Sequence, residues 1–116
     1  MYEHFRIRLG TAKQEEFHVL LLDNKHRVIE EKMITLGTLN QSLVHPREIF
    51  APAIELRAAS VILIHSHPSG DKPSKQDIEI TKRLSDVGEI MGIKVLDHII
   101  IGDGYFSFVD NGIMPV

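Results

Sequence analysis

Short apolar segments recur along the chain, each bounded by residues that are typical of turns. Because a short apolar run rich in β-branched residues is typical of a buried strand, these segments predict a β-sheet. Residues 17–22 are apolar at nearly every position, which predicts a central strand with both faces covered. Turn residues at 23–25 and at 102–104 predict hairpins. The predicted strands are residues 17–22, 27–36, 61–64, 94–101 and 105–109.

A first helix is predicted over residues 47–59, because Pro46 suits the first position of a helix. Pro52 lies inside this segment, where its ring clashes with the preceding turn and its missing N–H removes a hydrogen bond. We therefore expect a kink or a late start of the helix. The side chains expected to be buried are Ile49, Phe50, Ala53, Ile54 and Leu56.

A second helix is predicted from Ser74 to a point near Gly92, a residue suited to the left-handed position beyond a helix. Its apolar residues recur at helical spacing and form one face. Asp77 lies on that same face, so its carboxylate is expected to point inward, where it needs a polar partner. The apolar face consists of Ile80, Leu84, Val87 and Met91.

The order of strands and helices predicts an α/β (α+β) fold with a mixed central sheet flanked by helices. With 116 residues, the chain suits one domain over residues 1–116. Residues 1–13 are expected to form an edge strand or a flexible lead-in. Residues 38–45 are expected to form a loop with a short strand at Leu43 and Val44.

His65 and His67 follow directly after the predicted strand 61–64. Because side chains alternate across a strand, these two imidazoles project to the same side. Residues 68–73 contain a glycine and two prolines, which predict a tight turn that returns Asp77 towards the histidines. Two imidazoles and one carboxylate with an open fourth position are typical of a catalytic zinc site.

A purely structural interpretation of these residues also exists. Ser74 and Asp77 have the spacing of a capping box, in which each side chain bonds the backbone amide of the other residue. A lone histidine at the end of a strand is usually a half-buried core residue. The combination of two histidines at strand spacing, a turn and an inward acid is rarer, and it favours the metal site.

Composition narrows the possible functions. The chain has no cysteine, which excludes disulfides, a cysteine nucleophile and a thiolate metal site. No segment resembles a signal peptide or a membrane span, so a cytoplasmic protein without membrane contact is expected. The net charge is −3 and basic residues are scattered, whereas nucleic-acid-binding domains usually cluster them on one face.

The segment HSHPSGDKPSKQD resembles the signature of the JAMM (MPN+) metalloproteases: a distant Glu, His-Ser/Thr-His, a spacer and Ser-x-x-Asp. The flanking segments GTLNQSLVHPREIF and IKVLDHIIIGDGYFSF resemble the RadC branch of that family. The resemblance implies an MPN-type fold similar to the cytidine-deaminase architecture. The spacer here has six residues where the family usually has seven. The chain resembles a short form without the N-terminal helix-hairpin-helix region of many RadC-type proteins.

The resemblance implies a Zn²⁺ site with His65, His67 and Asp77 as ligands. It also implies that Ser74 supports the site, where its hydroxyl could donate to an oxyanion. The acid/base glutamate of the family falls on Glu15, with Glu16 as the second choice. Strand alternation favours Glu15, because it shares a side with the apolar positions 17, 19 and 21. The implied function is a zinc-dependent hydrolase that cleaves a peptide or isopeptide bond in a protein substrate.

Two other functions stay open at this stage. RadC-type proteins carry a DNA-repair label, so a nucleic-acid-processing role is one alternative, and a metal-binding scaffold without catalysis is another. A zinc deaminase is excluded because its usual cysteine ligands are missing. An exposed edge strand could pair two copies as a homodimer. His98 is interpreted as a core histidine bonded to a neighbouring carbonyl, with support of the metal site as the alternative.

Overall fold

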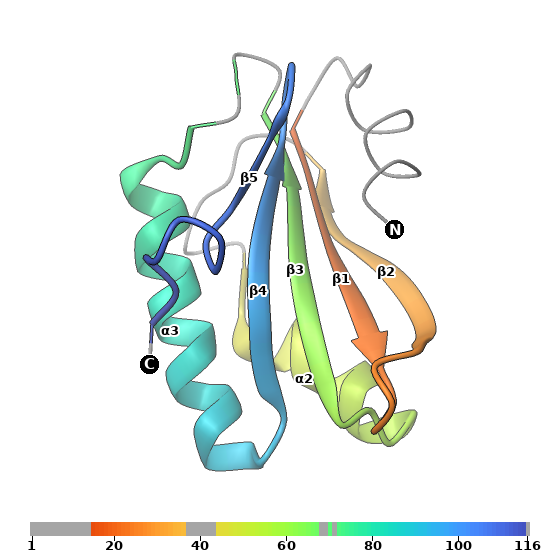
Figure 1. The fold of residues 1–116 in the computed structure, drawn as a ribbon. Helices are drawn as coiled ribbons and strands as arrows, with labels where there is room; N and C mark the ends of the chain where they lie inside the picture. The colour runs from red at the N-terminus through yellow and green to blue at the C-terminus, as the bar shows by residue number, and fades with distance from the viewer. Residues whose placement is uncertain (1–14, 37–43, 68–69, 71, 116) are drawn as a thin grey trace.

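The computed structural model describes residues 15–36, 44–67, 70 and 72–115. Within these residues, a five-stranded mixed sheet has the order β2-β1-β3-β4-β5 and carries two helices (Figure 1). The predicted α+β fold class is therefore confirmed, whereas residues 1–13 and Leu43 lie outside the described residues. The elements are β1 Glu16–Leu22, β2 Val28–Leu36, α2 Pro46–Glu55, β3 Ser60–Ser66, α3 Lys75–Met91, β4 Lys94–Ile101 and β5 Tyr105–Ser107.

Among the described strands, only β3 and β4 pair in parallel, and α3 makes the crossover between them. The hairpins β1–β2 and β4–β5 are antiparallel, as the turn residues predicted. β1 also pairs antiparallel with β3, so that Phe17 lies opposite His65. Val44 lies in no strand, which corrects that part of the prediction. Among the described residues, neither helix is long and apolar enough to cross a bilayer.

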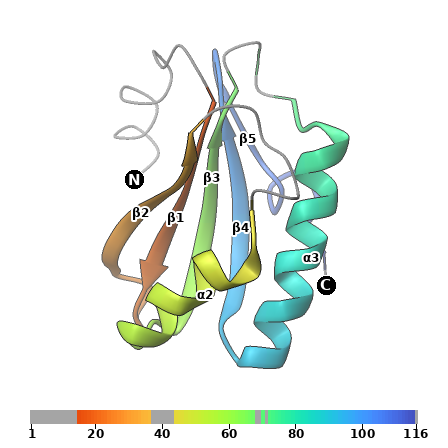
Figure 2. The same cartoon turned by 180° about the vertical axis from the view of Figure 1, so that it is seen from behind.

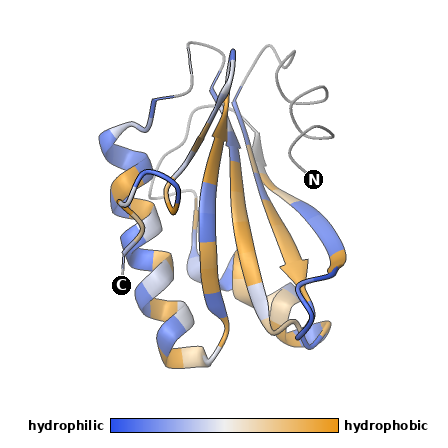
Figure 3. Cartoon of the chain, viewed as in Figure 1, coloured by the Kyte–Doolittle hydropathy of each residue, from blue (hydrophilic) through white to orange (hydrophobic). Residues whose placement is uncertain are grey.

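Both helices pack on one face of the sheet, as the view from behind shows (Figure 2). Phe17, Val19 and Leu21 of β1 point to this face, and their neighbours Leu20 and Leu22 point to the other. Side chains on both faces are buried, so β1 and β3 are apolar along most of their length (Figure 3). Strand alternation therefore decides which residues of β1 and β3 lie under the helices.

Helix α2 is shorter than predicted and buries fewer residues. It begins at Pro46 and continues through Pro52, so the proline does not delay its start. It ends at Glu55 because Arg57 adopts a left-handed conformation with φ of 57°. Ile54 and Leu56 are 54% and 37% exposed, so the prediction that they are buried is wrong. They lie off the narrow face formed by the buried Ile49, Phe50 and Ala53.

Helix α3 begins and ends as predicted, with Ser74 as its N-cap and Gly92 in the left-handed position after its last turn. Met91 is 40% exposed, so the prediction that it faces inward is wrong. Gly88 occupies the buried position instead, and a Cβ built there would lie 2.4 Å from the Ile93 carbonyl oxygen. The absence of a side chain therefore lets the helix approach the chain that enters β4.

This close approach predicts that Gly88→Ala destabilises the protein. An alanine in a helix usually stabilises by about 0.5–1 kcal/mol relative to glycine, but here the methyl group meets fixed backbone. We expect the free energy of unfolding in urea to fall by about 1–3 kcal/mol. The exposed Glu89→Ala on the same helix is the control and should change it by less than about 0.5 kcal/mol. Equal stability of wild type and Gly88→Ala would contradict this packing.

Candidate metal centre

The two histidines of the predicted site lie at the carboxyl end of β3. His65 points to the helix face and is 1% exposed, and His67 follows directly after the strand. The N–H of His67 donates to the Ile101 carbonyl oxygen at 2.8 Å, which holds it beside β4. The centroids of the two imidazole rings are 4.5 Å apart. The strand spacing thus brings both rings to one place, as the sequence predicted.

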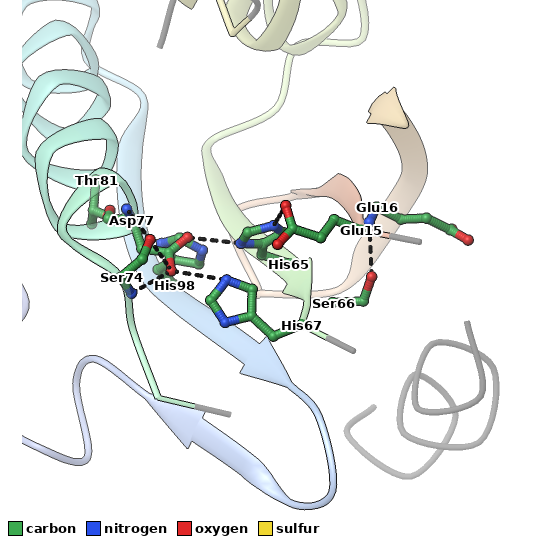
Figure 4. Close-up of polar contacts among 9 residues, drawn as sticks. All are labelled: Glu15, Glu16, His65, Ser66, His67, Ser74, Asp77, Thr81 and His98. Atoms are coloured by element: carbon green, nitrogen blue, oxygen red, sulfur yellow. Dashed lines mark hydrogen bonds and ion pairs between the residues drawn. The ribbon is translucent and has the colours of Figure 1, made fainter. Parts of the chain in front are cut away.

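Asp77 joins both histidines from the first turn of α3, and its side chain is completely buried. His65 Nδ1 lies 2.7 Å from Asp77 Oδ1, and His67 Nε2 lies 3.2 Å from Oδ2 (Figure 4). The backbone N–H of Ser74 also donates to Oδ2 at 2.7 Å. The carboxylate therefore accepts hydrogen bonds both from the histidines at the end of β3 and from Ser74 at the start of α3.

Asp77 belongs both to the capping box of α3 and to the proposed metal site. The Ser74 hydroxyl accepts from the Asp77 N–H at 3.1 Å and donates to Asp77 Oδ2 at 2.9 Å. The two sequence interpretations of these residues are thus compatible. In this arrangement the hydroxyl hydrogen of Ser74 orients the Asp77 carboxylate. The expected role of Ser74 as an oxyanion donor stays a prediction.

The two glutamates at the entrance of β1 point in different directions. Glu15 Oε2 lies 3.7 Å from His65 Nε2, and the side chain is 24% exposed. Glu16 Oε1 instead contacts His18 Nε2 at 2.8 Å, away from the cluster. The structure therefore brings Glu15 to the histidines and leaves Glu16, the second choice, outside.

Ser66 connects the entrance of β1 to the end of β3. Its Oγ accepts the backbone N–H of Glu16 at 2.8 Å, one residue beyond the last backbone pair of these strands, Phe17 with His65. Because Glu15 is the next residue in the chain, this bond restrains the backbone from which the Glu15 side chain projects.

His98, which the sequence suggested only as an alternative supporting residue, is a member of the cluster. Its ring is completely buried, and its Nδ1 lies 2.6 Å from Thr81 Oγ1 of α3. The prediction that it bonds a neighbouring carbonyl is therefore wrong. An irregularity in the pairing of β3 with β4 explains its direction: Val61 pairs with Val95, but Ile62 pairs with Asp97. The extra residue in β4 reverses the alternation and turns His98 towards the helix face.

Burial and hydrogen bonds within the cluster shift the pKa values of Asp77, His67 and His98. Burial of the Asp77 carboxyl would raise its pKa, but hydrogen bonds from His65 and His67 outweigh this and hold the pKa well below its usual range. The hydrogen bond to Asp77 raises the pKa of His67. Burial lowers the pKa of His98 to about 3, against the attraction of Asp77, so its imidazole is neutral at neutral pH.

The residues fit a divalent metal ion. Among the described residues, two groups of three have ligand atoms within 4.8 Å of one another: Glu15, His65 and His67, and His65, Asp77 and His98. The buried Nε2 atoms of His65 and His98 have no hydrogen-bond partner in this part of the chain. Imidazole nitrogens and carboxylate oxygens are the donors that zinc takes in proteins without cysteine ligands.

Comparison with known proteins places this site in a family context. The sequence profile of the RadC-like JAB domain matches residues 1–113. A UPF0758 protein of Trichlorobacter lovleyi is 56% identical over 116 residues, which are 98% of this chain and 50% of the relative. A UPF0758 protein of Geobacter sulfurreducens is 53% identical, with 98% and 51% coverage. The chain thus spans about half the length of these curated relatives.

The contact between His67 and Asp77 predicts a pH dependence of the metal-free protein. Because the folded pKa of His67 is raised, its stabilisation is complete below its unfolded pKa of about 6.5 and is lost as the pH rises through the folded value. Because the pKa of Asp77 is lowered, its stabilisation is present above about pH 3.9 and is lost as the pH falls. Wild type and His67→Gln should therefore differ most in free energy of unfolding near about pH 5.

The measurement is urea denaturation of both proteins between about pH 4 and 8, with a chelator present to keep them free of metal. Comparing the two proteins cancels the titration of the other histidines. We expect the difference to shrink towards the alkaline end of this range. A difference that stays constant with pH would show that His67 and Asp77 are not coupled in solution.

Proposed function

Because the chain belongs to the family of RadC-like JAB domains, we propose that it is a zinc-dependent hydrolase that cleaves a peptide or isopeptide bond. The family assignment confirms the resemblance seen in the segment HSHPSGDKPSKQD. The observation that carries the proposal is the convergence of Glu15, His65, His67 and Asp77 from three separate elements at one end of the sheet.

In this proposal His65, His67 and Asp77 hold the ion. All three are nearly or fully buried, which excludes bulk water from the donors. Ser74 keeps the carboxylate of Asp77 oriented through its hydroxyl and its backbone N–H. A bound zinc ion supplies Lewis-acid activation of water at neutral pH.

Glu15 has the position of a general acid/base. Its carboxylate lies beside His65 but keeps 24% of its side-chain surface exposed, so a substrate can reach it. It would accept the proton of the attacking water and return it to the leaving nitrogen of the amide. The backbone bond from Glu16 to Ser66 helps to hold Glu15 at this distance.

The proposed substrate is a peptide or isopeptide bond in a protein. It follows from family membership, since amide hydrolysis is the reaction implied for JAMM-type sites. The net charge of −3 gives a nucleic-acid role no support.

Metal content tests the donor set. Protein purified without chelators or added metal should contain about one zinc per chain by elemental analysis, because three deprotonated donors converge. His67→Ala and Asp77→Asn should lose it, whereas His45→Ala, a histidine outside the cluster, should keep it. Absence of zinc in the wild type, with no uptake of added zinc, would favour a scaffold without a metal.

The role of Glu15 requires a separate test. Glu15→Gln keeps the size of the side chain but removes the proton acceptor, so we expect hydrolysis to fall by about 10²- to 10⁴-fold with zinc retained. The matched control is Glu16→Gln, which should keep most of the activity. The assay uses a mixture of fluorogenic peptide and isopeptide substrates. Equal losses in both variants would refute the assignment of Glu15 as the base.

A further inference from the structure

We propose that His98 is a further nitrogen donor of the metal centre, because it forms a candidate donor set with His65 and Asp77, two of the residues proposed above to hold the ion. This proposal rests on the proposed function, because it adds a residue to the same site. The proposed chemistry makes no use of His98. Its ring is nevertheless completely buried, and one of its nitrogens lies within 4.8 Å of ligand atoms of His65 and Asp77, two of the residues that would hold the ion.

The hydrogen bonds around Thr81 determine which nitrogen of His98 carries the proton. Thr81 Oγ1 lies 2.6 Å from the Asp77 carbonyl oxygen, which can only accept, so the hydroxyl hydrogen is used there. The hydroxyl oxygen must then accept from His98 Nδ1, at 2.6 Å. His98 is therefore the Nδ1–H tautomer, and its Nε2 carries a free lone pair.

This arrangement is the one that metal-binding histidines usually show. A ligating imidazole donates its other N–H to a nearby acceptor, which fixes the tautomer and the direction of the ring. Here the Thr81 hydroxyl oxygen is that acceptor, and Nε2 is the nitrogen left to bind a metal ion. Among the described residues Nε2 has no hydrogen-bond partner, which is costly for a buried polar atom unless a cation or a donor satisfies it.

The ring is also held in place by apolar contacts. Phe108 stacks on it with ring centroids 4.8 Å apart, and Phe17 meets it edge-on at 5.8 Å. The irregular pairing before Asp97 points the residue to this face. The strand, two aromatic rings and a hydrogen bond thus fix the orientation of the His98 ring. A residue that only filled space in the core would not need the hydrogen bond.

Two substitutions separate the donor atom from the packing. His98→Asn can keep a hydrogen bond to Thr81 but has no atom in the place of Nε2. His98→Phe keeps a ring between Phe17 and Phe108. His18→Asn is the matched control, since His18 is also buried but contacts Glu16 and Glu31 away from the cluster. Thr81→Val removes the orienting hydroxyl and leaves the imidazole in place.

The experiment measures the affinity of each variant of the full chain for Zn²⁺ by competition with a chromophoric chelator. Visible absorption of the Co²⁺ form reports the coordination of the ion. We expect both His98 variants to bind zinc at least about tenfold more weakly and to change the Co²⁺ spectrum. Thr81→Val should weaken binding in the same direction, and His18→Asn should bind like the wild type.

Unchanged affinity and an unchanged Co²⁺ spectrum in His98→Asn would overturn the inference and leave the proposed function intact. If the His98 variants do not fold, Thr81→Val decides, because wild-type affinity in that variant would also overturn it. Failure of the wild type to bind any metal would overturn the proposed function and this inference together. The wild-type measurement therefore distinguishes the two failures.

Discussion

The structure around the site depends on one buried anion, the carboxylate of Asp77. A completely buried carboxylate is stable only if hydrogen-bond donors surround it, because transfer of a charge out of water is costly. Here the donors come from two directions: His65 and His67 at the end of β3, and Ser74 at the start of α3. The strand end, the turn and the helix start must therefore be in register for the fold to accommodate this charge.

The topology makes this register possible. β3 and β4 are parallel, so α3 must return along the sheet between them, and its first turn lies beside the carboxyl end of β3. β1 runs antiparallel to β3, which brings its entrance, with Glu15, to the same end of the sheet. Three segments far apart in sequence thus meet where the strands end, and the proposed chemistry is located there.

Stability and the proposed function share the same groups. The capping box that starts α3 also orients Asp77, and the Ser66 hydroxyl that closes the β1–β3 pairing also restrains Glu15. In the metal-free chain, the hydrogen bond to Asp77 raises the pKa of His67 and so favours its protonated form. Metal binding would require neutral imidazoles, so it would replace this hydrogen bond with coordination bonds and release protons. Folding and metal binding are linked through these side chains.

Local patterns in the sequence were sufficient to predict most of the fold and much of the candidate site. The presence of the strands, the caps of α3 and the shared direction of His65 and His67 depend only on neighbouring residues, and each was predicted correctly. Tertiary structure alone decided the direction of His98, because strict alternation from Val95 would have placed Asp97 on the helix face. It also decided the exposure of Met91, since the helix approaches the sheet at Gly88. Periodicity specifies which side chains share a face, but an extra residue in a strand or a close helix contact depends on packing between distant segments.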